Sequence, residues 1–324
     1  MTHHIHIVPS SKNYKKLPCV LTIGNFDGVH IGHQQLLQKV TSIAKLRNIE
    51  SCAFTFEPSP RSVLSPKTKP VRIANWVDKI NWLELNGIKN VILEPFDTAF
   101  AQHSAEWFID EILIKRLQTQ ALVVGYDFHF GRARSGTIKM IREKAPHIDI
   151  FQVEPLKISD VLDSNNKQIL QNIPATEIIS SSFIRNLLRS GSVEQAKIFL
   201  TRPHKIEGVV VSGMQRGRNI GFPTANLFPK TELIPESGVY AVTVRVDSED
   251  ILYQGMANLG VQPTFNGHSF QIEVHIFDFC TNIYGSVLEV FFHKRLRSEK
   301  KFSSTTDLIQ QLQIDKQKSK EILC

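Results

Sequence analysis

The stretch GNFDGVHIGHQQLL (residues 24–37) joins a short apolar run, Val20–Ile23, to a segment with helical spacing. A strand, a glycine-containing loop and a helix N-terminus together form an anion site, because free backbone N–H groups and the positive end of the helix dipole face the ligand. The imidazoles of His30 and His33 add donors at the same edge. The glycines that let the backbone approach a phosphate are Gly24, Gly28 and Gly32. The stretch therefore predicts a phosphate-binding turn after a buried strand.

The first half of the chain alternates strand-like and helix-like segments. The strand-like runs are Val20–Ile23, Cys52–Phe56, Asn90–Leu93 and Leu122–Gly125. The segments with helical spacing are Gln34–Leu46, Asn75–Leu85 and Ala105–Leu117. Short apolar strands separated by amphipathic helices predict a parallel sheet with helices on both faces.

The pattern changes near residue 200. Two helical segments are separated by Ser190-Gly191-Ser192, with Ser192 as the expected N-cap of the second; they are Ser181–Arg189 and Val193–Leu200. The β-like runs that follow are Ile206–Val211, Val239–Val246, Leu252–Ala257, Phe270–Phe277 and Val287–Phe292, with a closing helix over Thr305–Leu312. Several strands without intervening helices predict a small barrel or sandwich. We expect a first domain over 1–189, a linker helix over 190–202 and a second domain over 203–324.

The composition favours a cytoplasmic protein that binds phosphate-rich small molecules. The net charge is +7, but the basic residues are scattered, so no nucleic-acid partner is expected. The four cysteines lack metal or redox spacing, and no apolar run reaches the length of a signal peptide or membrane span. The early histidines at positions 3, 4 and 6 are an alternative metal site, but we expect a frayed polar terminus.

The loop of residues 24–33 suits attack on the α-phosphate of a nucleoside triphosphate. That chemistry needs no protein nucleophile, because positioning and charge stabilisation supply the catalysis. The alternative is a pair of histidines that only cap a helix.

Four strings together resemble the HxGH nucleotidyltransferases and, among them, the bacterial bifunctional riboflavin kinase/FAD synthetases. GNFDGVHIGHQ is the first, and the others are Phe56-Glu57-Pro58, GYDFHFG (125–131) and ISSSFIR (179–185). The sequence departs from the family pattern at Ser59, where many relatives carry histidine, and at Ser182, where threonine is commoner. The resemblance implies an α/β Rossmann-like nucleotidyltransferase domain followed by a β-barrel riboflavin kinase domain with a C-terminal helix.

The resemblance implies roles for residues of the first half. His30, His33 and Arg185 are the expected catalytic groups, with Arg185 neutralising the distal phosphates. Asp127 and Phe128 are expected to contact the flavin, although a core role for Phe128 and Phe130 is an equal alternative. The expected ATP-binding residues are Gly24, Asn25, Phe26, Gly28, Gly32, Ser180, Ser181 and Ser182. A serine-rich helix start is by itself usually only a cap.

A second glycine-rich stretch, VSGMQRGRNIGFPTANL (211–227), ends in a string that resembles the PTAN motif of riboflavin kinases. By that resemblance Thr224 and Asn226 hold Mg²⁺ and the ATP phosphates, and hard oxygen ligands suit Mg²⁺. The expected phosphate-binding residues are Gly213, Arg216, Gly217, Arg218 and Gly221. An ordinary hairpin connection is the alternative.

Glu273, in FQIEVHIFDF (270–279), matches the catalytic glutamate of the riboflavin kinases. Strand alternation places it opposite an apolar face, so an ordinary solvent-facing residue is the alternative. NLGVQPTF (258–265) resembles NxGxRPTF with Gln262 in place of arginine, and LRSEKKF (296–302) resembles LRxExKF. Arg297 is an expected flavin or nucleotide contact, or an ion-pair partner of Glu299.

The resemblance therefore implies a two-step enzyme that converts riboflavin to FMN with MgATP and FMN to FAD with a second ATP. Its partners would be ATP, riboflavin, FMN and FAD, with the flavins as substrates and products. One alternative is a class I aminoacyl-tRNA synthetase, because residues 30–33 spell HIGH. Against it, no KMSKS-like string is present. A non-catalytic nucleotide- or flavin-binding regulator is the other alternative.

Overall fold

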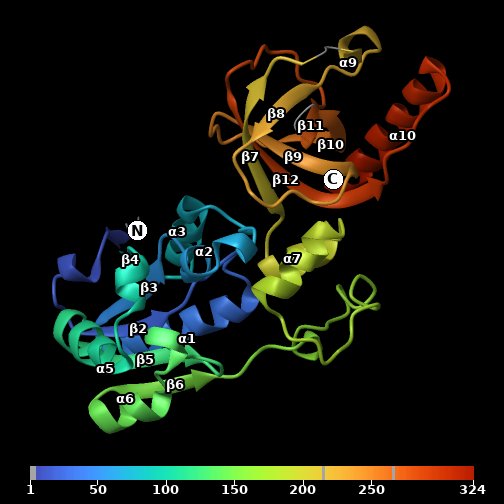
Figure 1. Cartoon of the computed structure of the whole chain (residues 1–324). Helices are drawn as coiled ribbons and strands as arrows, with labels where there is room; N and C mark the ends of the chain where they lie inside the picture. The colour runs from blue at the N-terminus through green and yellow to red at the C-terminus, as the bar shows by residue number, and fades with distance from the viewer. Residues whose placement is uncertain (1–4, 214–215, 265–266) are drawn as a thin grey trace. The chain divides into compact units, whose positions relative to one another are not determined.

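The computed structural model describes residues 5–213, 216–264 and 267–324, so His3 and His4 lie outside the described residues. Two units are present (Figure 1). The first comprises residues 5–71, 75–161 and 175–179, and the second comprises 72–74, 162–174 and the described residues from 180 onward. Each unit has its own sheet, and each is described separately.

The first unit is built on a six-stranded parallel sheet with the strand order β1-β4-β3-β2-β5-β6. Its strands are β1 (His6–Val8), β2 (Cys19–Ile23), β3 (Glu50–Phe56), β4 (Asn90–Glu94), β5 (Thr119–Gly125) and β6 (Asp149–Val153). The four strands predicted from the sequence are confirmed as β2, β3, β4 and β5. The edge strands β1 and β6 were missed, because one has three residues and the other lacks a continuous buried run.

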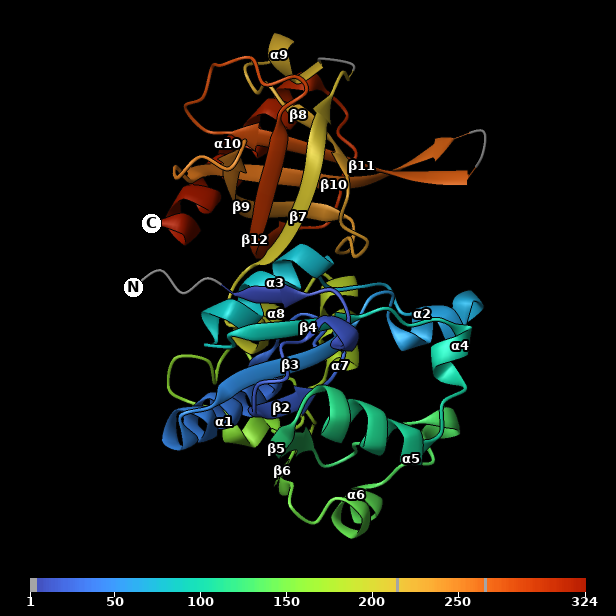
Figure 2. The same cartoon turned by 90° about the vertical axis from the view of Figure 1, so that its left-hand side faces the viewer.

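Both faces of this sheet are covered, as the alternation of strands and helices predicts. Leu21 of β2 belongs to a core cluster with Phe108 and Ile112, whereas its neighbour Val20 belongs to a cluster with Leu37 and Ile80. The helices behind these contacts are α1 (Ile31–Arg47) and α3 (Trp76–Leu85) on one face, and α5 (Ala105–Trp107), the π-helix η3 (Phe108–Arg116) and α6 (Ile138–Lys144) on the other (Figure 2).

The second unit is a closed six-stranded barrel with the order β10-β11-β8-β7-β12-β9 and antiparallel pairing (Figure 2). Its strands are β7 (His204–Val211), β8 (Ala225–Pro229), β9 (Gly238–Val246), β10 (Tyr253–Thr264), β11 (Gly267–Ile276) and β12 (Val287–Arg297). The sequence pattern missed β8, which has five residues and begins inside the PTAN string.

The longer helices of the second unit are α7 (Ser181–Arg189), α8 (Val193–Leu200) and α10 (Thr305–Leu323). The first two match their predicted bounds, but the Ser192 side chain makes no capping hydrogen bond. Helix α10 extends eleven residues beyond the predicted Leu312. The remaining short helices are η1 (Ser11–Asn13), α2 (Pro60–Leu64), η2 (Pro66–Thr68), α4 (Thr98–Ala101), η4 (Arg132–Arg134), η5 (Ile158–Asp160) and α9 (Arg216–Asn219).

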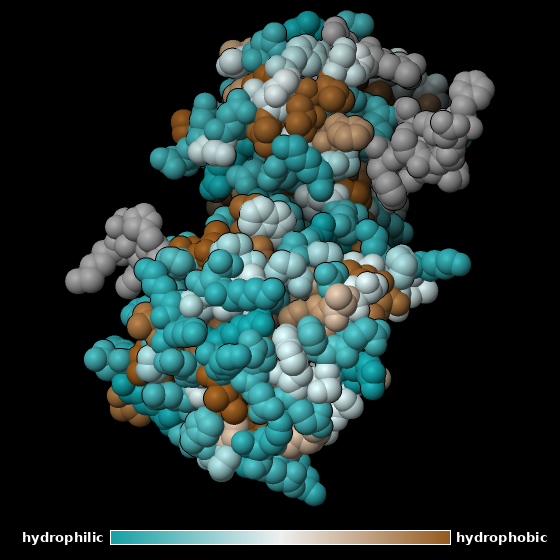
Figure 3. Space-filling view, turned by 60° about the vertical axis from the view of Figure 1, so that its left-hand side comes forward, coloured by the Kyte–Doolittle hydropathy of each residue, from teal (hydrophilic) through white to brown (hydrophobic). Residues whose placement is uncertain are grey.

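No helix in the described part of the chain is long and apolar enough to cross a membrane. On the face drawn in Figure 3, apolar side chains gather in small groups separated by hydrophilic ones.

The buried His204 makes the stability of the barrel depend on pH. Its Nε2 lies 2.9 Å from the carbonyl oxygen of Leu233, and burial lowers its pKa to about 4. As pH falls below the usual histidine value near 6.5, the unfolded chain takes up a proton that the folded barrel does not, which costs about 3 kcal/mol of stability by pH 4. We therefore expect the stability of His204→Gln, which retains a hydrogen-bond donor, to fall less between pH 6.5 and pH 4 than that of the unaltered chain. Urea unfolding followed by circular dichroism at several pH values measures this difference. An identical pH dependence in both proteins would contradict this assignment.

Candidate functional sites

The two histidines of the HIGH string lie where β2 leads into α1. His30 is the N-cap residue of α1 and is buried, and its ring stacks on His33 with centroids 3.8 Å apart and an interplanar angle of 25°. The His30 side chain makes no capping hydrogen bond. The alternative in which the histidines serve only as a helix cap is therefore not supported by the geometry.

His33 is held as a neutral imidazole. Burial, with the nearby His30 and Lys79, lowers its pKa well below the usual histidine value. The edge of Phe26 packs against its ring at a centroid distance of 5.4 Å. Its Nδ1 atom is buried and has no hydrogen-bond partner within the described ranges. A neutral imidazole donates one hydrogen bond without carrying a charge, which suits contact with a phosphate oxygen during transfer.

The backbone of this loop takes conformations that glycine tolerates best. Gly28 has φ of +77°, and Phe26 and Val29 also have positive φ, at +49° and +38°. A Cβ atom on Gly32 would lie 3.3 Å from the His30 ring. The Phe26 side chain is buried in the hydrophobic core beside the sheet, so its packing holds the loop in place. The expected ATP-binding positions Gly24 and Asn25 lie in the same turn.

Sequence reasoning missed Lys79 and Thr55 at this site. The Lys79 side chain, in α3, has a residual exposure of only 6%, and its Nζ donates to Thr55 Oγ1 at 3.1 Å. Lys79 stands directly beside Ile80 in the buried stripe of the helix. A lysine at an apolar helical position is the signal that could have found it.

The strings after β3 and β5 contribute mainly structural contacts. Phe128 and Phe130 stack at 5.5 Å, with Phe130 in the core and Phe128 packed against it, while Asp127 is exposed. Ser59 is the N-cap of α2, and its Oγ accepts a hydrogen bond from the Ser62 backbone N–H. The departure from histidine at position 59 thus provides a helix cap.

The ISSSFIR string forms the start of α7. Ser180 is the N-cap and accepts a hydrogen bond from the Phe183 backbone N–H at 3.2 Å. Arg185 is buried, and its Nη1 donates to Ser182 Oγ at 3.3 Å. The hydroxyl of Ser182 therefore contacts the Arg185 guanidinium. Ser181 is the first residue of the helix.

Two cavities lie on opposite faces of β11 in the barrel. The first encloses about 450 Å³ and the second about 430 Å³. Val274 and Ile276 line the first cavity, whereas Glu273 and His275 line the second. Thr224 lines both. A group that must move between two bound molecules could therefore be exchanged beside Thr224.

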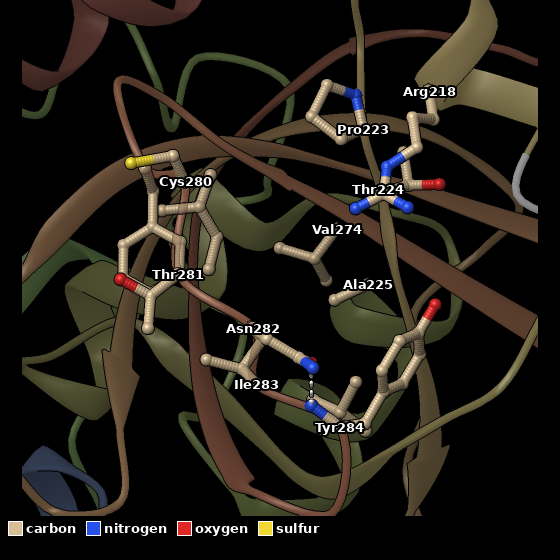
Figure 4. A pocket seen from close by; sticks show the side chains of 13 residues that line it. Arg218, Pro223, Thr224, Ala225, Val274, Cys280, Thr281, Asn282, Ile283 and Tyr284 are labelled. Atoms are coloured by element: carbon tan, nitrogen blue, oxygen red, sulfur yellow. Dashed lines mark hydrogen bonds between the residues drawn. The ribbon is translucent and has the colours of Figure 1, made fainter.

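The first cavity combines an apolar wall with one cationic side chain (Figure 4). Arg218 and Thr224 lie at one side, Val274 and Ala225 form the centre of the wall, and the loop of residues 279–284 closes the other sides. Gly221, with φ of +80°, lets the chain turn back from α9 to the PTAN string. The backbone of Arg216 begins α9, but its side chain lies outside the described part, as does that of Gln262.

In the second cavity a hydrogen-bonded chain links the expected base to the expected metal ligand. Gln271 Nε2 donates to Glu273 Oε1 at 2.8 Å and to Asn226 Oδ1 at 3.3 Å. Asn226 and Glu273 are also direct partners in the register of β8 and β11. Glu273 is therefore oriented within a cavity, which the solvent-facing alternative does not explain. Gln271 was missed, because nothing in its local sequence marks it.

Arg297 lines the second cavity, but the carboxylate that binds it is Asp315. Its Nε and Nη2 each lie 2.9 Å from Asp315 Oδ2, on the buried side of α10. The sequence analysis considered an ion pair between Arg297 and Glu299, and this was wrong, because the partner of Arg297 is Asp315. The same helix supplies Leu308 and Leu312 to the cavity wall, so this ion pair fixes that wall to the end of β12.

Gly213 is required by its close approach to Asn226. A Cβ atom at this position would lie 2.1 Å from Asn226 Nδ2, so the amide would have to move. We expect Gly213→Ala to lower the rate of phosphoryl transfer by about tenfold or more, since small displacements of positioning groups have effects of this order. The rate of FMN formation under saturating ATP measures this effect. Equal rates for Gly213→Ala and the unaltered chain would contradict the assignment.

Comparison with known proteins assigns a class to each unit. The family model for FAD synthetase matches residues 12–167, and the family model for riboflavin kinase matches residues 200–323. The parallel sheet with its histidine pair and the barrel with its two cavities thus define a transferase that forms flavin nucleotides in two steps. A curated relative from Haemophilus influenzae, named bifunctional riboflavin kinase/FMN adenylyltransferase, is 38% identical over 93% of each chain. One from Bacillus subtilis with the same name is 34% identical over 98% of this chain and 96% of its own.

The chain belongs to the bifunctional riboflavin kinase/FMN adenylyltransferase family. This membership replaces the aminoacyl-tRNA synthetase alternative, since the similarity extends over both units. A crystal structure titled macrolide-efflux protein, from Streptococcus pneumoniae, is 29% identical with a TM-score of 0.82 and covers 97% of this chain and 98% of its own. That title describes the other protein, and the similarity to it supports the two-unit architecture.

Proposed function

We propose that phosphorylation of riboflavin takes place beside Thr224, between the two cavities of the barrel. The first cavity, with Arg218 at one side, suits the nucleotide, and the second, with Glu273, suits the ribityl chain of riboflavin. The observation that carries this assignment is that Thr224 lines both cavities. Glu273 would accept the proton of the 5′-hydroxyl as that oxygen attacks the γ-phosphate.

Mg²⁺ fits the donor set at this position. Thr224 Oγ1 and Asn226 Oδ1 are hard oxygen atoms, and the Gln271 hydrogen bond orients the Asn226 amide with one lone pair left over. These two side chains would hold the ion, which neutralises phosphate charge when bound. Gly217 lines the second cavity beside Thr224, and a Cβ atom at this position would lie 2.2 Å from the Phe222 carbonyl oxygen, so the close approach of the two backbone segments requires glycine.

The histidine pair is assigned to adenylyl transfer. The imidazoles of His30 and His33 donate hydrogen bonds to the transferred α-phosphate, where negative charge grows. The attacking FMN phosphate is already anionic, so no general base is needed. Arg185 with Ser180, Ser181 and Ser182 is assigned to the distal phosphates and Asp127 with Phe128 to the flavin, on the family motifs that they match.

The location and partners follow the same reasoning. The enzyme is proposed to act in the cytoplasm on ATP, riboflavin and FMN, with FAD as final product and without a nucleic-acid partner. The proposed domain limits are 1–189 and 203–324, joined by 190–202, which includes α8.

A time course with riboflavin, ATP and Mg²⁺ tests this proposal, with the flavins separated by chromatography. FMN appearing first and FAD later is the expected result. FMN alone would contradict the assignment of the histidine pair and make Ser59 and Ser182 the first positions to examine. Neither product from folded protein would favour the non-catalytic flavin-binding alternative.

A further inference from the structure

A positively charged side chain is buried beside the histidine pair. Lys79 has 6% of its side chain exposed, in a helix whose other buried residues include Ile80 and Leu83. Moving an ammonium group out of water is unfavourable unless hydrogen bonds or opposite charges compensate it. A buried ammonium therefore needs polar or charged neighbours, and the neighbours of Lys79 indicate which part of the protein its charge serves.

Lys79 is connected to the phosphate-binding turn through one residue. Its Nζ donates to Thr55 Oγ1 at 3.1 Å, and Thr55 Oγ1 donates in turn to the Asn25 carbonyl oxygen at 3.4 Å. Thr55 is fully buried near the end of β3. The ammonium is therefore linked through Thr55 to the loop that contains Gly24 and Asn25, at the carboxyl edge of the sheet.

Lys79 is also close enough to His33 to act on it electrostatically. It is one of the charges that keep the His33 imidazole neutral. Two groups therefore lie near each other: a neutral hydrogen-bond donor, His33, and the positive charge of Lys79, which Thr55 holds in place. An arrangement of this kind stabilises an anion that binds beside both groups, because the protein charge is already in place and needs no reorganisation.

We propose that Lys79 is a phosphate-binding catalytic residue of the adenylyl-transfer site, whose ammonium contacts the ATP triphosphate. This proposal rests on the assignment of the histidine pair to that reaction. An FMN phosphate oxygen forms a bond to the α-phosphorus, and the bond from that phosphorus to the oxygen bridging to the β-phosphate breaks. The bonding electrons leave with pyrophosphate, and Lys79 keeps its proton while it neutralises the charge that develops there.

A purely structural role is the competing explanation. Asp27 is a buried carboxylate of the same loop, and Lys79 could serve only to hold the loop in place. Three variants of the full chain separate the two roles. Lys79→Met removes both the charge and the link, Lys79→Arg keeps a charge, and Thr55→Val removes the link but leaves the lysine.

The expected result is an ordered series of adenylylation rates with FMN supplied. Lys79→Met should lower kcat by about 100-fold or more, as loss of one preorganised donor does. Thr55→Val should lower it by about fivefold, the effect of one lost hydrogen bond. Lys79→Arg should recover part of the loss. Inhibition by inorganic pyrophosphate should weaken in Lys79→Met but not in Thr55→Val.

Equal losses in Lys79→Met and Thr55→Val, with unchanged pyrophosphate inhibition, would overturn the proposal in favour of the structural role. His33→Ala distinguishes failure of the site assignment from failure of the lysine proposal. If His33→Ala still forms FAD at the full rate, the assignment of the histidine pair to adenylyl transfer fails. If His33→Ala is inactive but Lys79→Met is fully active, only the lysine proposal fails. Lys45→Met, at an exposed position of α1, is the matched control and should retain full activity.

Folding of the variants can be followed separately in the first unit. The three tryptophans, Trp76, Trp82 and Trp107, all lie there, so their fluorescence reports its unfolding. If Lys79→Met does not fold, lysine-labelled unaltered protein decides the matter by NMR, with Lys79→Arg for assignment. The Lys79 signal should shift when inorganic pyrophosphate binds, and binding without a shift would overturn the proposal.

Discussion

Replacing His33 with alanine is expected to lower FAD formation by about 100- to 1000-fold while FMN formation from riboflavin continues. The imidazole is kept neutral by burial and by its neighbours, so it can donate to the transferred phosphate without adding charge. The barrel contains none of the atoms that this substitution removes. Two assays of one preparation measure the result: FMN with ATP, followed by FAD and pyrophosphate, and riboflavin with ATP, followed by FMN.

The control for this substitution is His33→Asn, whose amide retains a donor. It should recover part of the rate if hydrogen bonding to phosphate is the function of His33. Phe26 packs against the same ring, so the substitution can also disturb the packing against the sheet. Unfolding followed by tryptophan fluorescence distinguishes such damage from a loss of catalysis. A His33→Ala protein that formed FAD at the full rate would remove the histidine mechanism.

Glu273→Gln is expected to stop phosphorylation and to leave adenylylation of supplied FMN unchanged. The amide has the shape of the carboxylate but cannot accept the hydroxyl proton, and general bases contribute about 100- to 10,000-fold. Its oxygen can still accept the hydrogen bond from Gln271, which in the native chain spans 2.8 Å, so the cavity should keep its form. Riboflavin binding measured by fluorescence should therefore change little while FMN formation is lost.

A substitution at the neighbouring Gln271 is the variant to compare with Glu273→Gln. Gln271→Ala removes the link between Glu273 and Asn226 and leaves the carboxylate in place, so a partial loss is expected. Loss of both activities in Glu273→Gln would argue for coupling between the two units or for misfolding. A fully active Glu273→Gln protein would return Glu273 to the role of an ordinary strand residue.

The sequence was informative where function is carried by short contiguous strings. His30, His33, Thr224 and Glu273 were found in this way, with fold and family confirmed by the structure and the relatives. Their individual roles remain predictions. The β-α alternation found the central strands, because fully buried strands have continuous apolar runs.

The residues that sequence reasoning missed act through tertiary placement. Gln271 and Asp315 are unremarkable in their local sequence, and the only local signal of Lys79 is its position among apolar helix residues; each is defined by a partner on another element or by burial. The π-helical form of residues 108–116 and the full length of α10 were missed for a related reason. A polar, lysine-rich helix end has weak periodicity, and its contact with the barrel sustains it.

The alternation of β11 also bears on how this enzyme can change over evolution. Successive residues face different cavities, with Val274 and Ile276 on one side and Glu273 and His275 on the other. A point substitution in this strand can therefore change the wall of one cavity while the wall of the other stays intact. A one-residue insertion or deletion in β11 would instead turn the residues of each cavity wall toward the other cavity.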